Sequence, residues 1–288
     1  MKQLAVLSGK GGTGKTTVVA SLAVLAHQAI VVDCDVDAPD LHLLLEPTVI
    51  KAQEFKGSKL AVIDETKCLK CGLCVEGCRF NAIKENIEVD PFACDGCRVC
   101  EVICRQGAIT LRERVAGQAF VSRTKYGFMA HALLSPGQAN SGKLVTLTRL
   151  FARILAEKEK SPLLMIDGPP GIGCPVIASV TGVDVGLIVT EPTMSGIHDL
   201  KRALELLKHF SVPAFVCVNK YDINEENAKK IVGFCRINNL EFIGKIPFDP
   251  IVTEAMLQGK PVVEFAPESD VAEEINKIWE NLRLRLSL

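Results

Sequence analysis

The chain has 288 residues, 48% of them hydrophobic and 23% charged, which suits one large or two medium domains with an ample core. Its formal net charge is −1, so the sequence offers no basic field for nucleic acid or an anionic membrane, and we expect neither as a partner. The N-terminus lacks the pattern of a signal peptide and no apolar run reaches the ~18 residues of a membrane span, so we expect a cytoplasmic protein.

The first predicted strand is the apolar run Leu4–Leu7, which is followed by a glycine-rich turn and by a helix over Val18–His27. Residues Gly9–Thr16 match the pattern G-x-x-x-x-G-K-[ST] at every fixed position. Glycines let backbone N–H groups approach a phosphate, and the helix N-terminus adds positive potential. Lys15 can reach the β- and γ-phosphates, and the Thr16 hydroxyl can bind Mg²⁺. We therefore predict a nucleotide site that includes Gly9, Lys10, Gly11, Gly12, Thr13, Gly14, Lys15, Thr16 and Thr17.

Two further predicted strands end in carboxylates. The run Ile30–Val32 is followed by Asp33 and Asp35, and the run Leu163–Ile166 is followed by Asp167. A carboxylate at a strand end beside a phosphate loop can bind Mg²⁺ or accept a hydrogen bond from an attacking water. The predicted magnesium residues are Thr16, Asp35 and Asp167.

Cysteines become frequent between these two strands, from Gly57 onward. Two runs with the spacing C-x₂-C-x₂-C-x₃-C repeat at an offset of 26 residues, which is typical of a bacterial two-cluster ferredoxin. Three closely spaced thiolates bind one 4Fe–4S cluster, and the last cysteine of the other run completes the set. The first predicted cluster is bound by Cys68, Cys71, Cys74 and Cys104, and the second by Cys78, Cys94, Cys97 and Cys100. Zinc is the alternative, although zinc sites use paired cysteines rather than triplets with a distant fourth.

Turn-like residues flank the cysteine region on both sides. We predict a small α+β ferredoxin-like domain over residues 57–114, inserted in a larger domain made of residues 1–56 and 115–288. Such an insertion costs little closure entropy where its two ends lie close together. After the insert, the pattern predicts strands over 119–126 and 128–134 and a helix over 144–158.

The phosphate loop carries a second lysine, in Lys10-Gly-Gly-Thr-Gly-Lys15-Thr16, and so resembles the deviant phosphate loop of the MinD/ParA/Mrp and nitrogenase iron-protein ATPases. In that class the extra lysine contacts the phosphates of the partner subunit, which implies an ATP-dependent homodimer. The resemblance also implies that Asp35 orients the hydrolytic water, so the expected catalytic residues are Lys10, Lys15 and Asp35. It covers the chain from its start to about residue 55 and again from about residue 116 onward.

Two features leave alternatives open. Asn219-Lys220-Tyr221-Asp222 matches the N-K-x-D pattern that recognises guanine in small GTPases. The resembled family instead binds adenine with an asparagine at this strand end and with the loop that starts at Pro247, so we favour ATP over GTP. Cys174 lies where the nitrogenase iron protein has a cysteine that bridges a cluster between subunits. We interpret it as a small residue packed at a helix start, and a third, intersubunit cluster is the alternative.

Further strands are predicted over 185–190, 213–218 and 241–246, with helices over 197–209 and 225–237. Cys217 and Cys235 are predicted to lie in the core. The tail over 271–288 has an apolar helical stripe that either packs on the sheet or binds a membrane, as in MinD-type proteins, and its weak basic face favours packing.

Strands that alternate with helices after a phosphate loop predict an α/β fold with a doubly wound, mostly parallel sheet. The expected cofactors are ATP or ADP, Mg²⁺ and two 4Fe–4S clusters per chain. The first functional hypothesis is an ATPase whose dimer switching is coupled to electron transfer, or to maturation of a metal centre, on an unidentified redox or metalloprotein partner. The alternatives are an ATP-dependent iron–sulfur cluster scaffold or carrier and a MinD/ParA-like spatial regulator with redox sensing.

Overall fold

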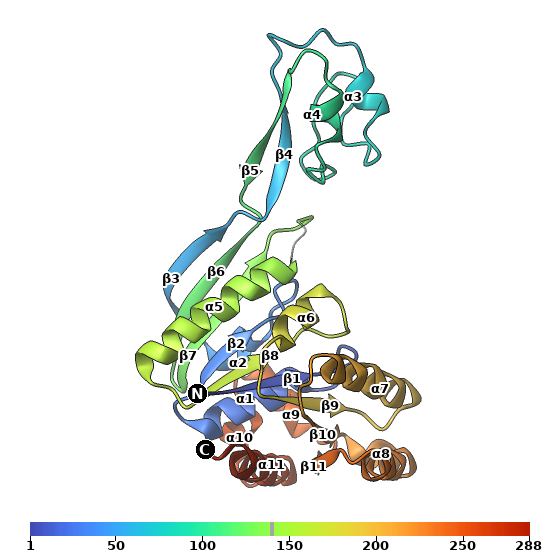
Figure 1. The fold of residues 1–288 in the computed structure, drawn as a ribbon. Helices are drawn as coiled ribbons and strands as arrows, with labels where there is room; N and C mark the ends of the chain where they lie inside the picture. Colours follow the sequence, from blue (N-terminus) through green and yellow to red (C-terminus); the bar gives the residue numbers. More distant parts are fainter. Residues whose placement is uncertain (139–140) are drawn as a thin grey trace.

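The computed structural model describes residues 1–138 and 141–288, and within them a nine-stranded sheet forms the centre of the larger part of the chain (Figure 1). Across the sheet the order is β11 (Glu241–Ile246), β10 (Ala214–Asn219), β9 (Val185–Thr190), β1 (Lys2–Leu7), β8 (Leu163–Asp167), β2 (Ile30–Asp33), β7 (Gly127–Leu134), β6 (Gly117–Thr124) and β3 (Thr48–Phe55). The strands from β11 to β7 are parallel, whereas β6 and β3 are antiparallel to their neighbours. The predicted α/β fold with a mostly parallel sheet is confirmed.

Helices cover both faces of this sheet, and each face has its own hydrophobic core. One core receives α1 (Lys15–Ala26), α2 (Leu41–Leu45), α9 (Ile251–Leu257), α10 (Val262–Phe265) and α11 (Asp270–Leu286). The other receives α5 (Ser141–Glu159), α6 (Cys174–Val180), α7 (Met194–His209) and α8 (Glu225–Ile237). Alternate residues of β1 enter opposite cores, Leu4 and Val6 on one side and Ala5 and Leu7 on the other. A strand covered on both faces reads as a continuous apolar run, as the sequence of β1 does.

A second, two-stranded sheet extends away from the first (Figure 1). It pairs β4 (Ser58–Ile63) with β5 (Ile109–Arg114) antiparallel, and it carries the short helices α3 (Leu73–Glu76) and α4 (Val99–Ile103). Because β3 leads into β4 and β5 leads into β6, these two antiparallel segments form a ribbon that joins the small sheet to the large one. We call residues 57–114 the cysteine unit and the remainder the large unit.

One polar chain of contacts ties the base of the ribbon to the large unit. Arg114 donates from Nε to Ser58 Oγ at 2.8 Å, and Ser58 Oγ donates to Gln138 Oε1, also at 2.8 Å. The other guanidinium nitrogens of Arg114 donate to the carbonyl oxygens of Pro91 and Cys94. This arginine therefore connects the ribbon, the loop after β7 and the second cysteine run.

The apolar stripe of α11 consists of Ile275, Ile278, Trp279, Leu282 and Leu286, all of which are buried in the core that also contains α1. The packing interpretation of this tail is confirmed, because the stripe is already covered by the chain itself. Among the helices in the described part of the chain, none has the length and apolar character that a membrane span requires.

Candidate functional site

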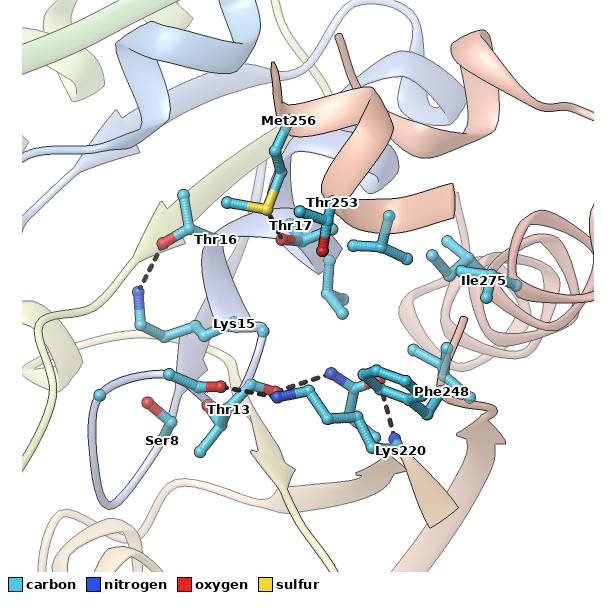
Figure 2. Close-up of a pocket in the computed structure, with 18 of the residues that line it drawn as sticks. Ser8, Thr13, Lys15, Thr16, Thr17, Lys220, Phe248, Thr253, Met256 and Ile275 are labelled. Carbon is cyan, nitrogen blue, oxygen red and sulfur yellow. Dashed lines mark hydrogen bonds between the residues drawn. The ribbon is translucent and has the colours of Figure 1, made fainter. Parts of the chain in front are cut away.

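A cavity of about 330 Å³ lies at the carboxyl end of the parallel strands, over the loop that joins β1 to α1 (Figure 2). Ten of the sequence-predicted residues line it: Gly11, Gly12, Thr13, Gly14, Lys15, Thr16, Thr17, Asp35, Asn219 and Pro247. Gly9, Lys10 and Asp167 were predicted too, but they lie outside this lining. This is the edge of an open parallel sheet where ligands are expected, because the loops after several strands meet there.

The loop is braced by two residues of the N-K-x-D run. Asn219 Nδ2 donates to the Thr13 carbonyl oxygen at 2.8 Å, and Lys220 Nζ donates to the Gly12 carbonyl oxygen at 3.0 Å. These bonds satisfy loop carbonyls that would otherwise repel an anionic phosphate. A side chain at Gly14, which has a left-handed φ of 84°, would overlap the Asn219 amide, so this close approach requires glycine.

Gly9 is needed for a different reason. A Cβ atom at this position would overlap Asp199 near the start of α7, so the glycine of the motif allows that helix to pack against the loop. Thr13 has a buried hydroxyl that finds no hydrogen-bond partner among the described residues, although it lines the cavity. A buried unpaired hydroxyl at the phosphate end fits a ligand that supplies the missing partner.

Lys15 and Asp167 form a buried ion pair between Nζ and Oδ1, and Lys15 Nζ also lies 3.3 Å from Thr16 Oγ1. Thr16 and Asp35 thus face the cavity, whereas Asp167 is only 1% exposed and lies against Lys15. The lysine would have to exchange this carboxylate for phosphate oxygens when a nucleotide binds. The magnesium role of these three residues stays a prediction.

Asp33 organises the backbone that carries Asp35. Its carboxylate accepts hydrogen bonds from the N–H groups of Asp35 at 3.0 Å and Leu41 at 3.2 Å, which also starts helix α2. Complete burial, together with the nearby Asp167 carboxylate, raises the pKa of Asp33 well above its usual range. Burial likewise raises the pKa of Asp35, whose Oδ1 accepts from the Ala38 N–H at 3.1 Å. Asp35 can accept a hydrogen bond from a water in the cavity while Asp33 holds its position.

Lys10 is engaged within its own chain. Its Nζ lies 3.0 Å from Glu191 Oε2 and 3.3 Å from Ser195 Oγ, while Glu191 Oε1 lies 2.7 Å from Lys220 Nζ. Burial would raise the pKa of Glu191, but the hydrogen bonds from Lys220 and Lys10 outweigh it and lower that pKa. Sequence reasoning missed Glu191, since its position in the loop after β9 carries no recognised motif. The contact between Lys10 and the phosphates of a partner subunit stays a prediction.

The cysteines gather around two separate cavities in the cysteine unit. One is lined by Cys68, Cys71, Cys74 and Cys104, and the other by Cys78, Cys94, Cys97 and Cys100. These are the two ligand sets that the spacing predicts. All twelve cysteines lie within the described residues and form no disulfide.

The surroundings of these sulfurs suit a polynuclear cluster. Backbone N–H groups point at three of them, from Lys70 to Cys68 and from Ala108 to Cys104 at 3.4 Å, and from Ala82 to Cys78 at 3.3 Å. Hydrogen bonds to ligand sulfurs are one of the means by which proteins tune such clusters. Within the described residues no three Cys, His, Asp or Glu side chains converge as ligands of a single ion would. Cluster binding by these sulfurs stays a prediction, with zinc as the alternative.

The remaining cysteines divide into two groups. Cys217 and Cys235 are buried in the large unit, which confirms the core prediction, and Cys34 is buried as well. Cys174 is the first residue of α6, as predicted, but its side chain is exposed, so the prediction that it packs there is wrong. The helix begins at the surface, and only the helix residues from Val176 onward reach the core.

Comparisons with known proteins agree with this architecture. The family described as CobQ/CobB/MinD/ParA nucleotide binding domain matches residues 4–262. An uncharacterized protein of Methanocaldococcus jannaschii is 33% identical over 98% of this chain and 96% of its own. An iron-sulfur cluster carrier protein of Aquifex aeolicus is 26% identical over 93% of this chain and 64% of its own.

Solved structures share the fold. The septum site-determining protein MinD of Pyrococcus horikoshii, complexed with Mg-ADP, superposes with a TM-score of 0.61 over 98% of this chain and 95% of its own, at 20% identity. An identity this low shows the fold alone. Since the family match spans most of the chain and covers the phosphate loop, the carboxylate strands and most of the cavity lining, this chain belongs to the CobQ/CobB/MinD/ParA nucleotide-binding family of P-loop proteins.

Proposed function

We propose that this protein binds and hydrolyses Mg·ATP, that residues 57–114 form an inserted ferredoxin-like domain holding two 4Fe–4S clusters, and that nucleotide-driven switching of a homodimer is coupled to electron transfer, or to maturation of a metal centre, on a partner protein. The observation that carries the proposal is the pair of cavities, each lined by one complete set of four predicted ligands. They stand on a ribbon that continues two strands of the nucleotide-binding sheet.

At the nucleotide site, the chain's own residues would bind the phosphates, orient the attacking water and neutralise negative charge. Lys15 would leave Asp167 for the β- and γ-phosphates, and the Thr13 hydroxyl would gain the partner that it lacks. Thr16 and Asp35 would hold Mg²⁺, directly or through water, with Asp167 close behind, and bound Mg²⁺ offsets the negative charge of the phosphate oxygens. Asp35 would also orient the attacking water, and Lys10 would complete the charge cluster across the dimer.

In the cysteine unit, Cys68, Cys71, Cys74 and Cys104 would hold one cluster, and Cys78, Cys94, Cys97 and Cys100 the other. A bound 4Fe–4S cluster supplies a site for one-electron chemistry. Five of these eight cysteines belong to a small apolar core that includes Ala61, Ile83 and Ile109, namely Cys74, Cys78, Cys94, Cys100 and Cys104, whereas Cys71 and Cys97 are exposed. Such a core limits water access, which is one determinant of cluster potential.

We favour adenine over guanine as the base, and the cavity lining supports this choice. Beyond the phosphate loop the cavity is lined by Ile246, Phe248, Val252, Val271 and Ile275, and also by Asp249, whose Oδ1 accepts from the Ile251 N–H at 2.9 Å. Asp222, the residue of the N-K-x-D pattern that would read guanine, is outside the lining. A mostly apolar surface suits the flat face of a purine, and adenine requires no carboxylate acceptor.

The second candidate is an ATP-dependent cluster scaffold or carrier. It is favoured by the similarity to the iron-sulfur cluster carrier protein of Aquifex aeolicus. The two candidates differ in how firmly the clusters are held, because complete ligation by four cysteines favours retention and redox use over transfer. A spatial regulator of the MinD type has only the fold in its favour.

The test is anaerobic reconstitution of the full chain, followed by redox titration and light scattering without nucleotide, with Mg·ADP and with a non-hydrolysable ATP analogue. We expect about eight iron atoms per chain, a dimer with the analogue and a shift of at least one midpoint. The Lys15→Ala variant is the control, since its midpoints should not respond to nucleotide. Identical midpoints and identical mass in all three states would contradict the coupling.

The carrier candidate needs its own measurement. The reconstituted chain is mixed with an apo-acceptor protein, and cluster transfer is followed by absorbance and by iron content after separation. Rapid transfer that depends on ATP would favour the carrier. Retention of all iron through many turnovers would favour the redox function.

A further inference from the structure

We propose that Asp222 is a positioning residue that fixes the loop 247–249 so that the Phe248 ring covers the base of the bound nucleotide. The inference rests on the proposed nucleotide binding and adds the residues that set affinity for the base. It gives the aspartate of the N-K-x-D run a role other than the recognition of guanine.

The geometry starts from two loops that follow neighbouring strands. Asp222 lies in the 3₁₀ turn η1 (Tyr221–Asn224) after β10, and Phe248 lies just after β11. The Phe248 N–H donates to Asp222 Oδ1 at 2.7 Å. A second contact joins η1 to the end of strand β11, because Lys245 Nζ lies 3.8 Å from the centre of the Tyr221 ring. The loop after β11 is therefore held in place from β10.

Phe248 is placed to meet a base. Phe248 is 52% exposed and lines the cavity together with Ile246 and Ile275. Figure 2 shows Phe248 and Ile275 at the same end of the cavity. The phosphate loop occupies the other end of the same cavity, so a nucleotide whose phosphates lie on Gly12–Thr16 directs its base toward Phe248. A large exposed aromatic ring on a cavity wall gains free energy when a flat ring stacks on it.

Asp222 is badly placed to read guanine. It does not line the cavity, and one carboxylate oxygen is occupied by the Phe248 N–H. Direct recognition of guanine would need this carboxylate to face the cavity and accept from the base. A hydrogen bond from a backbone amide to a carboxylate is instead a strong way to fix a loop.

The test compares three ligands on the full chain by calorimetry: Mg·ADP, Mg·GDP and Mg·tripolyphosphate, which has no base. Asp222→Ala and Phe248→Ala should each weaken Mg·ADP binding by about tenfold or more and leave tripolyphosphate within about twofold. Asp222→Asn should bind Mg·ADP like the wild type, because the amide oxygen still accepts from the Phe248 N–H. Glu225→Ala is the matched control, an exposed acid three residues on that pairs with Lys229 at 3.6 Å, and it should change none of the three affinities.

Several outcomes would overturn the inference. One is unchanged Mg·ADP affinity in Asp222→Ala, and another is an equal loss of tripolyphosphate, which would indicate a general disturbance of the site. Loss of Mg·GDP alone in Asp222→Asn would show that the carboxylate reads guanine. A wild-type chain that binds tripolyphosphate but no purine would overturn the base contact while leaving the phosphate site intact. If it binds none of the three ligands, the proposed ATPase function fails, and this inference fails with it.

Discussion

The nucleotide cavity and the two cysteine cavities differ in the packing and the polar contacts that hold their walls in place. The nucleotide cavity stands on a sheet with a hydrophobic core on each face, and its loop carbonyls and its lysine are paired with partners of the same chain. The buried core of the cysteine unit, among the described residues, is Ala61, Cys74, Ala82, Ile83, Cys94, Cys100 and Ile109. Three members of that core are themselves proposed ligands. We therefore expect the nucleotide cavity to fold without its ligand and the cysteine cavities to depend on what they bind.

Removal of iron should therefore destabilise the cysteine unit and leave the large unit folded, and this is the largest effect that we expect. Helices α3 and α4 have four and five residues, too few to be stable alone, and the core around them is small. Without clusters, the amides over 58–114 should lose their protection from hydrogen exchange, while β1 and β8 keep theirs. Hydrogen-exchange mass spectrometry of reconstituted and iron-free protein measures both regions at once.

The matched variants for this prediction each replace one cysteine, a proposed ligand in one case and an exposed residue of the large unit in the other. Cys100→Ser removes a buried proposed ligand and should lower the protection of the cysteine unit, whereas Cys174→Ser changes an exposed thiol of the large unit and should have no effect. Full protection of 58–114 in the iron-free chain would show that the unit folds without its clusters. The contrast between the two regions would then disappear.

The Lys15→Ala variant should have the opposite pattern, with a defect at the nucleotide cavity and none in the cysteine unit. This change removes the cation at the phosphate end, and we expect ATP hydrolysis to fall by about 10²–10³-fold, as for the loss of one key electrostatic contact. Iron content per chain should stay at the wild-type value, because the cysteine unit contributes nothing to this contact. A phosphate-release assay and iron quantitation test the two halves of the prediction. Lys230→Ala on the surface of α8 is the control, and near-normal hydrolysis in Lys15→Ala would contradict the assigned role.

The same contrast explains what the sequence could predict. Repeats, strand ends and apolar periodicity are local, and they were sufficient for the fold class and for helices and strands such as α8 and β11, whose bounds agree with the predicted ones. The two cysteine sets were also predictable, because their spacing encodes which thiols surround each cavity. Each of these signals reflects a constraint within a short segment.

The features that were missed depend on contacts between distant segments. Strand β3 was not predicted, because the residues from Thr48 to Glu54 are all exposed and show no buried face. Its strand conformation comes from pairing with β6, which follows the whole cysteine unit. Glu191 pairs with Lys10 and Asp222 accepts from the Phe248 N–H, and both of these partners lie in loops that follow other strands. No local pattern in the sequence carries these pairings.

Acid should weaken the large unit through one histidine. His131 bonds to Ser122 through Nε2 at 2.9 Å and stacks on Phe120 at 5.0 Å, and burial, aided by His42, lowers its pKa from 6.5 to about 4. The unfolded chain takes up this proton first as the pH falls, so stability is full above about pH 6.5 and is lost between there and about pH 4. From pH 7.5 to pH 5 this group should cost about 2 kcal/mol.

The single tryptophan, Trp279, lies in the core of the large unit, so its fluorescence reports on that unit in urea unfolding. His131→Phe keeps a ring to stack on Phe120 and should reduce the pH dependence by about the stated 2 kcal/mol. His198→Gln, at an exposed position on α7, should not change it. An unaltered pH dependence in His131→Phe would assign the acid sensitivity to other groups.

The smallest expected effect tests whether the ion pair between Glu191 and Lys10 opposes phosphate binding in the nucleotide cavity. Glu191 holds Lys10 and Lys220 together, and under the proposed function its carboxylate would compete with phosphate for the charge of Lys10. Glu191→Gln keeps the shape of the side chain and removes its charge. Since a partly exposed ion pair contributes about 1 kcal/mol or less, tripolyphosphate affinity should rise by about fivefold at most.

The direction of this change decides between two descriptions of the cavity. A rise in affinity means that the resting chain holds Lys10 away from phosphate, so the site is folded in advance but must break one contact before it is used. A fall means that Glu191 serves the loop mainly through Lys220 and the Gly12 carbonyl, and that the resting geometry is already the binding geometry. Glu191→Asp, which keeps the charge on a shorter side chain, separates the loss of charge from the loss of reach. The cysteine unit has no equivalent internal competitor in the described residues, because its sulfurs accept only backbone N–H groups there.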